Sequence, residues 1–195
     1  MSQSVKNQRV LVAGGVSRSL INFRLPLLRS FRDLGFEVWT TAAGNDVCIG
    51  QQLIEENVAF RSAPVNRAGF NPFEDYIYFR FLKNLIAEVQ PDIVLGYTHK
   101  AAIYSSFASG RAKSFSLVTG LGYAFMESEK RCDPRRSVAR WVLCFLYKRA
   151  LRKNKLSFFQ NEEDRDEFVR RDLVPNEKTK VINGSGVDLN YFQFH

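Results

Sequence analysis

Short apolar runs alternate with longer amphipathic segments from residue 9 nearly to the end of the chain. Runs of this kind, ended by Gly, Pro or polar residues, are typical of strands buried on both faces of a parallel sheet. The pattern predicts strands at 9–13, 36–42, 58–63, 93–98, 115–119, 156–160 and 179–183.

The segments between these runs have the three- and four-residue spacing of helices. In the first of them Pro26 predicts a kink or a later start, because proline cannot donate a hydrogen bond inside a helix. Gly35 suits the position just after a helix, and Pro72 suits the first turn of another. The pattern predicts helices at 17–34, 46–57, 73–89, 101–112, 135–151 and 161–172.

This alternation predicts an α/β fold with a Rossmann-like, doubly wound parallel sheet and right-handed crossovers. The length of 195 residues suits one domain. We expect residues 1–184 to form that domain and residues 185–195 to begin a linker.

The composition predicts a folded chain without a membrane span. Hydrophobic residues make up 45% of the chain and aromatic residues 13%, which are larger shares than disordered proteins have. No stretch approaches the roughly 20 apolar residues that cross a bilayer, and residues 1–9 do not form a signal peptide. Three widely spaced cysteines and two histidines predict buried free thiols, without a zinc site or disulfide framework, which fits the cytoplasm.

The net charge of +8 predicts an acidic partner, such as anionic lipid, a phosphorylated substrate or nucleic acid. Residues 130–155 hold ten Lys or Arg and one acid, Asp133, whereas the rest of the chain is nearly balanced. The excess of positive charge is therefore confined to this segment. Nucleic acid is disfavoured, because no recognised nucleic-acid-binding module accompanies the basic residues.

Ligands of open parallel sheets collect outside the carboxyl ends of the strands, and Gly14 and Gly15 follow the first strand. Glycines let backbone N–H groups approach a phosphate, and the next helix adds a favourable dipole. A tight turn is an equal alternative, since neither Gly-x-Gly-x-x-Gly nor a Walker loop is present. Asn22 and Arg24 are candidate substrate-binding residues or ordinary helix surface.

Tyr97, Thr98, His99 and Lys100 come directly after the fourth apolar run. A His and a Lys at the end of a strand can provide a general base and an anion anchor, which makes His99 and Lys100 the catalytic candidates. The alternative is a hydrogen-bonded loop histidine beside a solvated lysine.

Thr119, Gly120, Gly122 and Tyr123 follow the fifth strand. The two glycines would let a ligand approach closely, and Tyr123 could stack on the face of a sugar. A simple turn with a core tyrosine is the alternative.

The helix predicted at 135–151 has an apolar centre with cations crowded at both ends. A helix packed on the sheet with basic ends explains this pattern. The alternative is interfacial membrane contact, with aromatic rings inserted and cations on lipid phosphates. The candidate contacts to lipid or acceptor phosphate are Arg131, Arg135, Arg136, Arg140 and Trp141.

Several of these segments together resemble the N-terminal domain of family 4 glycosyltransferases of the GT-B fold. The nearest group is the bacterial transferases that build lipid-linked oligosaccharides and capsular or O-antigen units. The segments that carry the resemblance are 17–28, 67–75, 91–100, 118–125, 159–164 and 182–188.

The resemblance implies a retaining transfer from a nucleotide sugar to an acceptor on a polyprenyl diphosphate, at the inner face of the cell membrane. The N-terminal domain would bind the acceptor, and residues 130–155 would face the lipid head groups. Gly14 and Gly15 would lie near the donor's diphosphate. Tyr97 to Lys100 match the family's Tyr-Thr-x-Lys-Pro loop, with Ala101 in place of Pro and His99 at the variable position.

One departure concerns the donor side. The family's donor-domain signature, two Glu separated by seven residues, is absent from the sequence. We therefore expect the nucleotide sugar to bind mostly through a domain that this chain lacks, and a separate chain could supply it. The 195 residues alone are predicted to be inactive.

Asp164 and Asp166 match the Asp-x-Asp pattern of metal-dependent glycosyltransferases. They lie in the acidic stretch 161–168, which is typical of the first turn of a helix, where the helix dipole favours negative charge. We therefore predict neither a metal nor a cofactor.

Two other functions remain open. A nucleotide-cofactor oxidoreductase is disfavoured, because no acidic residue ends the second strand, where Thr40 and Thr41 lie. A non-catalytic membrane-surface module would use the basic region alone.

Overall fold

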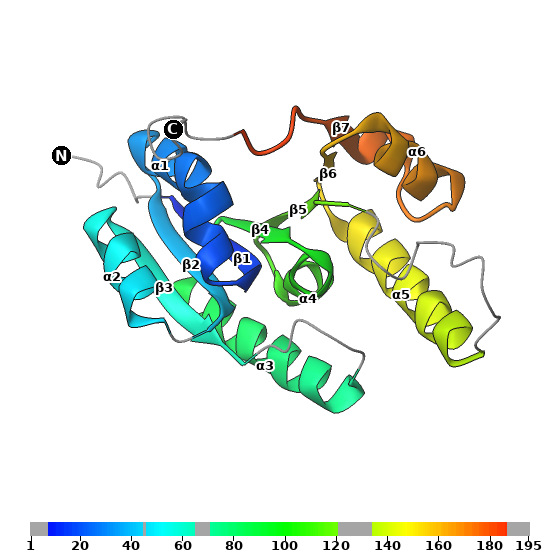
Figure 1. Ribbon diagram of the computed structural model, residues 1–195, viewed down its shortest axis with the longest axis horizontal. Coiled ribbons are helices and arrows are strands. Elements are labelled where there is room, and N and C mark those ends of the chain that lie inside the picture. Colours follow the sequence, from blue (N-terminus) through cyan, green and yellow to red (C-terminus); the bar gives the residue numbers. More distant parts are fainter. Residues whose placement is uncertain (1–7, 45, 65–70, 121–133, 187–195) are drawn as a thin grey trace, which may run out of the picture.

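The computed structural model describes residues 8–44, 46–64, 71–120 and 134–186. These residues form one parallel sheet of seven strands in the order β3-β2-β1-β4-β5-β6-β7 (Figure 1). The strands are β1 (Arg9–Val16), β2 (Glu37–Ala43), β3 (Val58–Ala63), β4 (Ile93–Tyr97), β5 (Lys113–Val118), β6 (Leu156–Phe159) and β7 (Thr179–Val181). The strand order reverses between β1 and β4, as in a doubly wound sheet. The predicted fold class is confirmed.

Helices cover both faces of the sheet, as Figure 1 shows. They are the π-helical turn η1 (Leu20–Arg24), α1 (Leu25–Asp33), α2 (Val47–Glu55), α3 (Pro72–Val89), α4 (His99–Ala108), α5 (Pro134–Lys153), α6 (Glu162–Arg170) and the short 3₁₀ turn η2 (Asn176–Lys178). Core residues of η1, α1 and α2 cluster on one face, and those of α3 to α6 cluster on the other.

Strand β1 is buried on both sides, which is why its sequence is apolar without alternation. Val10 and Val12 pack toward α1 and α2, while Leu11 and Ala13 pack toward α3 and α4. Successive side chains of a strand point to opposite faces, so a strand between two helical layers needs an apolar residue at every position.

The first helix differs from the prediction at 17–34. The chain forms a five-residue π-helical turn first, and α1 begins only at Leu25, with Pro26 in its first turn. Proline is tolerated there because the first N–H groups of a helix have no partner in the helix. Of the two alternatives for Pro26, the later start is confirmed.

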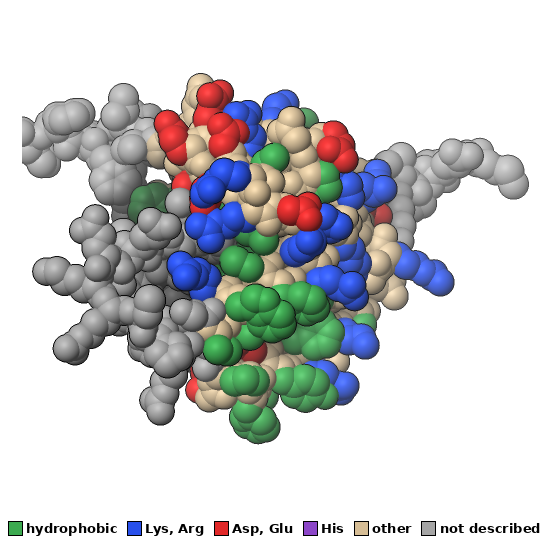
Figure 2. Space-filling model, turned by 90° about the vertical axis from the view of Figure 1, so that its right-hand side faces the viewer, with side chains coloured by type: hydrophobic (Ala, Val, Ile, Leu, Met, Phe, Trp, Pro, Cys, Tyr) green, Lys and Arg blue, Asp and Glu red, His purple; other side chains and the backbone are tan. Residues whose placement is uncertain are grey.

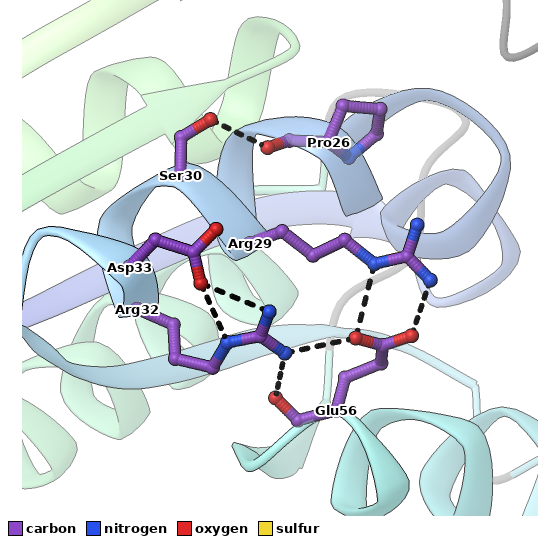
Figure 3. A network of polar contacts seen from close by, with 6 residues as sticks. All are labelled: Pro26, Arg29, Ser30, Arg32, Asp33 and Glu56. Carbon is purple, nitrogen blue, oxygen red and sulfur yellow. Dashed lines mark hydrogen bonds and ion pairs between the residues drawn. The ribbon is translucent and has the colours of Figure 1, made fainter.

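Helix α1 is tied to the end of α2 by a polar network around Glu56 (Figure 3). Arg29 Nε and Arg32 Nη1 each donate to Glu56 Oε2 at 3.0 Å, and Arg32 also donates to the carbonyl oxygen of Glu56 at 3.1 Å. Hydrogen bonds from Arg29, and then from Arg32, hold the pKa of the Glu56 carboxyl below its usual range.

The bounds of α4 and β1 also differ from the predicted ones. Helix α4 begins at His99 rather than at residue 101, and it ends at Ala108 rather than at residue 112, because Gly110 has a positive φ of 57°. Strand β1 extends through Gly14 and Gly15 to Val16.

The cysteines are only partly as expected. Cys48 and Cys144 are free thiols, but Cys48 is exposed and Cys144 is only half-buried, so the expectation of full burial is wrong for both. Cys48 lies in the first turn of α2, whose buried residues are Ile49 and Leu53. Cys132 lies outside the described residues.

Candidate functional site

Gly14 and Gly15 lie where β1 meets the carboxyl end of β4. A Cβ atom on Gly14 would lie 2.2 Å from Tyr97 Oη, and one on Gly15 would lie 2.9 Å from Thr98 Oγ1. The glycines are therefore required for close packing between the ends of β1 and β4. Their predicted place in a turn after the strand is corrected: both belong to β1, next to a register shift against β2 between Ala13 and Val16. Such bulges are frequent beside active sites.

Tyr97 is buried at this junction, and its hydroxyl lies 2.8 Å from Ser19 Oγ. Ser19 donates its own proton to the carbonyl oxygen of Val16, so Tyr97 is the donor between the two hydroxyls. Burial raises the pKa of Tyr97 to about 12, with Ser19 and Arg24 opposing the shift. Tyr97 therefore remains a neutral donor at neutral pH.

Arg24 stacks on Tyr97, with its guanidinium carbon 4.7 Å from the ring centroid. Arg24 is only 5% exposed, so the alternative that it is ordinary helix surface is wrong. Its Nη1 donates to Ser185 Oγ at 2.5 Å and to the carbonyl oxygen of Phe23 at 3.3 Å. Gln160 donates to the same Ser185 oxygen at 2.9 Å. Burial lowers the pKa of Arg24, and the proximity of Tyr97 opposes that shift.

Lys100 is not the solvated lysine that the sequence allowed. Its Nζ lies 2.7 Å from Asp75 Oδ1 of α3, and the two side chains are 14% and 9% exposed. Tyr104 is hydrogen-bonded to Asp75, and burial, reinforced by that carboxylate, raises the pKa of the Tyr104 phenol. The charge of Lys100 is thus compensated inside the protein. Its role as an anion anchor stays a prediction.

His99 is held by helix α5. Its Nδ1 lies 2.6 Å from the hydroxyl oxygen of Tyr147, which is fully buried. Burial raises the pKa of Tyr147, so the phenol is neutral and can donate to Nδ1. The contact holds the imidazole ring of His99 against α5, and its catalytic role stays a prediction.

The structure therefore brings together some of the predicted site residues and separates others. Gly14, Gly15, Arg24, Tyr97 and Thr98 lie against one another at the end of β1 and β4. His99 and Lys100 bind to different helices, α5 and α3. Asn22 is half-buried in η1, and Thr119 and Gly120 follow β5.

Some predicted residues cannot be placed. Gly122, Tyr123 and Arg131 lie outside the described residues, and only the helical backbone is described for Arg135 and Arg136.

Four residues at this edge were missed by the sequence analysis, and they are Ser19, Asp75, Gln160 and Ser185. All four lie in segments that carry the family resemblance, which was the available signal. Nothing in the sequence indicates that Ser185 lies beside Arg24, since 161 positions separate them.

Helix α5 has two different sides. Leu143, Tyr147, Ala150 and Leu151 are buried in the core that α5 shares with α4 and α6. This supports the interpretation of a helix packed on the domain. The opposite side exposes Val138, Trp141 and Phe145, which are three and four positions apart and so lie along one stripe.

The exposed stripe is hydrophobic and is bordered by cations. Trp141 is 69% exposed, Phe145 is 52% exposed, and their rings stack with centroids 6.0 Å apart. On the side of the molecule drawn in Figure 2, hydrophobic side chains gather in one area with Lys and Arg beside and above it. Lys148 and Arg152 of α5 both contact Asp172, at 2.7 and 2.6 Å, so part of the basic charge is compensated.

The acidic start of α6 is a helix cap. The side chain of Asn161 accepts from the backbone N–H of Asp164 at 2.7 Å and donates to its carboxylate at 3.1 Å. Asp166 pairs with Arg165 instead of converging on Asp164. Among the residues that the structure describes, no three His, Cys, Asp or Glu lie close enough to hold a metal ion.

In the part of the chain that the structure describes, no helix is both long enough and apolar enough to span a bilayer.

No model of a known protein family matches the chain. A curated protein of Campylobacter jejuni, N,N'-diacetylbacillosaminyl-diphospho-undecaprenol alpha-1,3-N-acetylgalactosaminyltransferase, is 25% identical over 177 residues. The match covers 89% of this chain and 45% of that protein. The chain thus spans about half the length of the relative that it matches.

Solved structures with similar folds include a glycosyltransferase from Rickettsia africae, with a TM-score of 0.63 and 16% identity over 96% of this chain and 45% of that one. MurG of Acinetobacter baumannii has a TM-score of 0.56 and 12% identity, and the match covers 93% of this chain and 46% of the MurG chain. UDP-GlcNAc 2-epimerase of Neisseria meningitidis, bound to UDP-GlcNAc, has a TM-score of 0.61 and 14% identity. That match covers 91% of this chain and 47% of the epimerase chain.

These likenesses establish the fold, which is that of one Rossmann-like domain of a GT-B protein. An epimerase and transferases share it, so the fold alone does not decide the reaction.

Proposed function

We propose that this chain is the acceptor-binding half of a retaining glycosyltransferase in bacterial surface polysaccharide or glycan biosynthesis. The reaction would move a sugar from a nucleotide sugar to an acceptor on a polyprenyl diphosphate. The observation that carries the proposal is the sequence match over 89% of the chain to a transferase whose name contains a diphospho-undecaprenol-linked substrate. The GT-B domain fold supports the same conclusion.

The edge at β1 and β4 is the proposed place of the sugar and diphosphate groups. It lies at the point where the strand order reverses, and ligands of doubly wound sheets bind there. The backbone of Gly14 and Gly15 would lie close to the ligand, and the hydroxyls of Ser19 and Tyr97 would form hydrogen bonds with it. His99, which Tyr147 holds in place, would contact the acceptor, and Lys100, which pairs with Asp75, would anchor its negative charge.

Helix α5 is the proposed contact with the membrane. Its stripe of Val138, Trp141 and Phe145 combines aromatic and apolar side chains with nearby cations, which suits the interface of an anionic leaflet. The charge excess in residues 130–155 supports this partner. The protein would then be cytoplasmic and peripheral on the inner face of the cell membrane, where a polyprenyl-linked acceptor presents its diphosphate.

The donor half is proposed to lie outside this chain, either in further sequence or in a separate polypeptide. The matched relative is more than twice as long as the matched segment. The cationic groups that stabilise a leaving nucleoside diphosphate would come mainly from that half. The 195 residues alone should therefore bind acceptor without turning over a nucleotide sugar.

Vesicle flotation tests this function. Vesicles of phosphatidylethanolamine and phosphatidylglycerol are prepared with and without a polyprenyl-diphosphate-linked sugar. We expect tighter binding to the vesicles that carry the acceptor. When UDP-GalNAc or UDP-GlcNAc is added to these vesicles and the chain, we expect no release of UDP. Equal binding to both vesicles would favour a plain membrane-surface module. Sugar transfer by the chain alone would overturn the predicted dependence on a donor half.

A further inference from the structure

We propose that Arg24 forms a diphosphate-binding site that Ser185 covers. The inference rests on the proposed function only for the choice of ligand. It is carried by an arginine that is buried at the carboxyl edge of the sheet and that no carboxylate among the described residues compensates.

The partners of Arg24 within the described residues are all uncharged. Nη1 donates to the Ser185 hydroxyl and to the carbonyl oxygen of Phe23, the guanidinium lies over the Tyr97 ring, and Nε is buried without a hydrogen-bond partner. Burying a cation costs several kcal/mol unless an anion or a full set of hydrogen bonds compensates it.

The other buried cation of this edge has its anion. Lys100 is nearly as buried as Arg24 and pairs with Asp75 at 2.7 Å. More exposed arginines in α1 likewise bind a carboxylate, that of Glu56. Within the described part of the chain these cations thus have carboxylate partners and Arg24 does not, which leaves its guanidinium available to an anion from outside.

The surroundings suit a phosphate. A guanidinium offers parallel N–H donors that match two phosphate oxygens, and these charge-assisted bonds are about twice as strong as neutral ones. Hydroxyl and amide groups of Ser185, Gln160 and Ser19 lie around the same cluster. Arg24 is also the last residue of η1, and π-helical turns occur frequently at functional sites.

Ser185 holds the position on Nη1 that a phosphate oxygen would take. It lies in the segment after β7 that runs back along the sheet edge toward α1 (Figure 1). Gly184 and Gly186 flank it with φ of 61° and 68°, values that glycine adopts at little cost, and a Cβ on either would meet open space. A swing of this segment would break two hydrogen bonds of Ser185, those to Arg24 and Gln160.

Both a nucleotide sugar and a polyprenyl-linked acceptor contain a diphosphate, so two ligands share this chemistry. Calorimetric titrations with inorganic diphosphate, UDP and farnesyl diphosphate distinguish them. Loss of UDP binding alone in an Arg24 variant assigns the site to the donor. Loss of farnesyl diphosphate binding alone assigns it to the acceptor.

The test compares the wild-type chain with Arg24→Met, Arg24→Lys and Ser185→Ala, with Arg111→Met, an exposed arginine in the turn before β5, as the control for general charge. We expect Arg24→Met to weaken inorganic diphosphate binding at least tenfold without lowering Tm, since it replaces an uncompensated buried cation with an apolar chain of similar length. Arg24→Lys should retain part of the affinity. Ser185→Ala should bind diphosphate as tightly as wild type or more tightly. Arg111→Met should change binding less than twofold.

A structural role for Arg24 predicts the opposite set of results. Unchanged diphosphate affinity in Arg24→Met and Arg24→Lys would overturn the site, as would weaker binding in a folded Ser185→Ala. If Arg24→Met does not fold, the other two variants decide. If the wild-type chain does not bind inorganic diphosphate but still binds acceptor-containing vesicles more tightly than plain ones, the Arg24 site is wrong and the proposed function stands. The reverse result retains the anion site and rejects the function.

Discussion

The carboxyl edge around Tyr97 and the outer stripe of α5 are two candidate binding regions built in opposite ways. At the edge, Tyr97, Ser19 and Arg24 are held by packing and hydrogen bonds inside the fold. On α5, Trp141 and Phe145 project outward beside cations. Substitutions in the close packing around Tyr97 should therefore change folding, whereas substitutions on the stripe should change binding without affecting the fold.

The largest effect is expected at Gly14. A methyl group there would overlap the Tyr97 hydroxyl at 2.2 Å, and the fully buried ring has little room to move. Gly14→Ala should lower the free energy of unfolding by roughly 2–3 kcal/mol, measured by urea denaturation.

Gly50 provides the matched control for this substitution. It lies inside α2, and a Cβ there meets open space. Gly50→Ala should raise the free energy of unfolding by about 0.5–1 kcal/mol. A Gly14→Ala variant as stable as wild type would show that β1 and β4 need not approach so closely.

The second effect concerns the stripe. Replacing both Trp141 and Phe145 with Ser should weaken binding to anionic vesicles roughly tenfold, because two rings would no longer enter the interface. The urea midpoint should not fall. Ile54→Ser on α2 is the control, since Ile54 is also 69% exposed but lies away from the basic segment. Equal losses in both variants would contradict a dedicated membrane face.

The third effect lies where the two regions meet. Tyr147→Phe removes the hydroxyl that binds His99 Nδ1 at 2.6 Å and should cost about 1 kcal/mol of unfolding free energy. Tyr76→Phe is the control, because Tyr76 is exposed on α3. Urea denaturation of both variants measures the difference, and equal stabilities would argue against a tie between α4 and α5.

The smallest effect is expected in the network of Figure 3, away from both regions. The pKa of Glu56 is lowered in the folded state by Arg29 and Arg32, so its contribution exists above the unfolded pKa of about 4.3 and is lost as pH falls through the folded value. Glu56→Gln should cost less than about 1 kcal/mol at pH 7.

The pH dependence distinguishes this ion-pair network from simple packing. The difference between wild type and Glu56→Gln should shrink when urea denaturation is repeated below pH 4. Glu55→Gln is the neighbouring control and should show little difference at either pH. A Glu56→Gln difference that does not depend on pH would contradict an ionic contribution.

The arrangement of the sheet followed from the sequence because it depends on local patterns. Continuous apolar runs such as 93–98 require helices on both faces, and the alternation of strands and helices then restricts the topology to a doubly wound sheet. The position of Pro26 likewise restricted the start of α1.

The contacts of the site could not be predicted in the same way, because they join distant segments. The pairs Arg24 with Ser185 and Lys100 with Asp75 depend on how β7 and α3 return to the sheet edge. Gly14 and Gly15 were recognised as important, but their packing against Tyr97 and Thr98 becomes evident only when β1 and β4 are adjacent.

Hydrogen–deuterium exchange with nanodiscs tests the central claim, recognition of a diphosphate-linked lipid acceptor, most directly. The chain is compared on anionic nanodiscs with and without the polyprenyl-diphosphate-linked sugar. The account predicts that α5 is protected on both, and that 14–24 and 97–100 gain protection only when the acceptor is present. Protection confined to α5 in both samples would contradict acceptor recognition at the sheet edge.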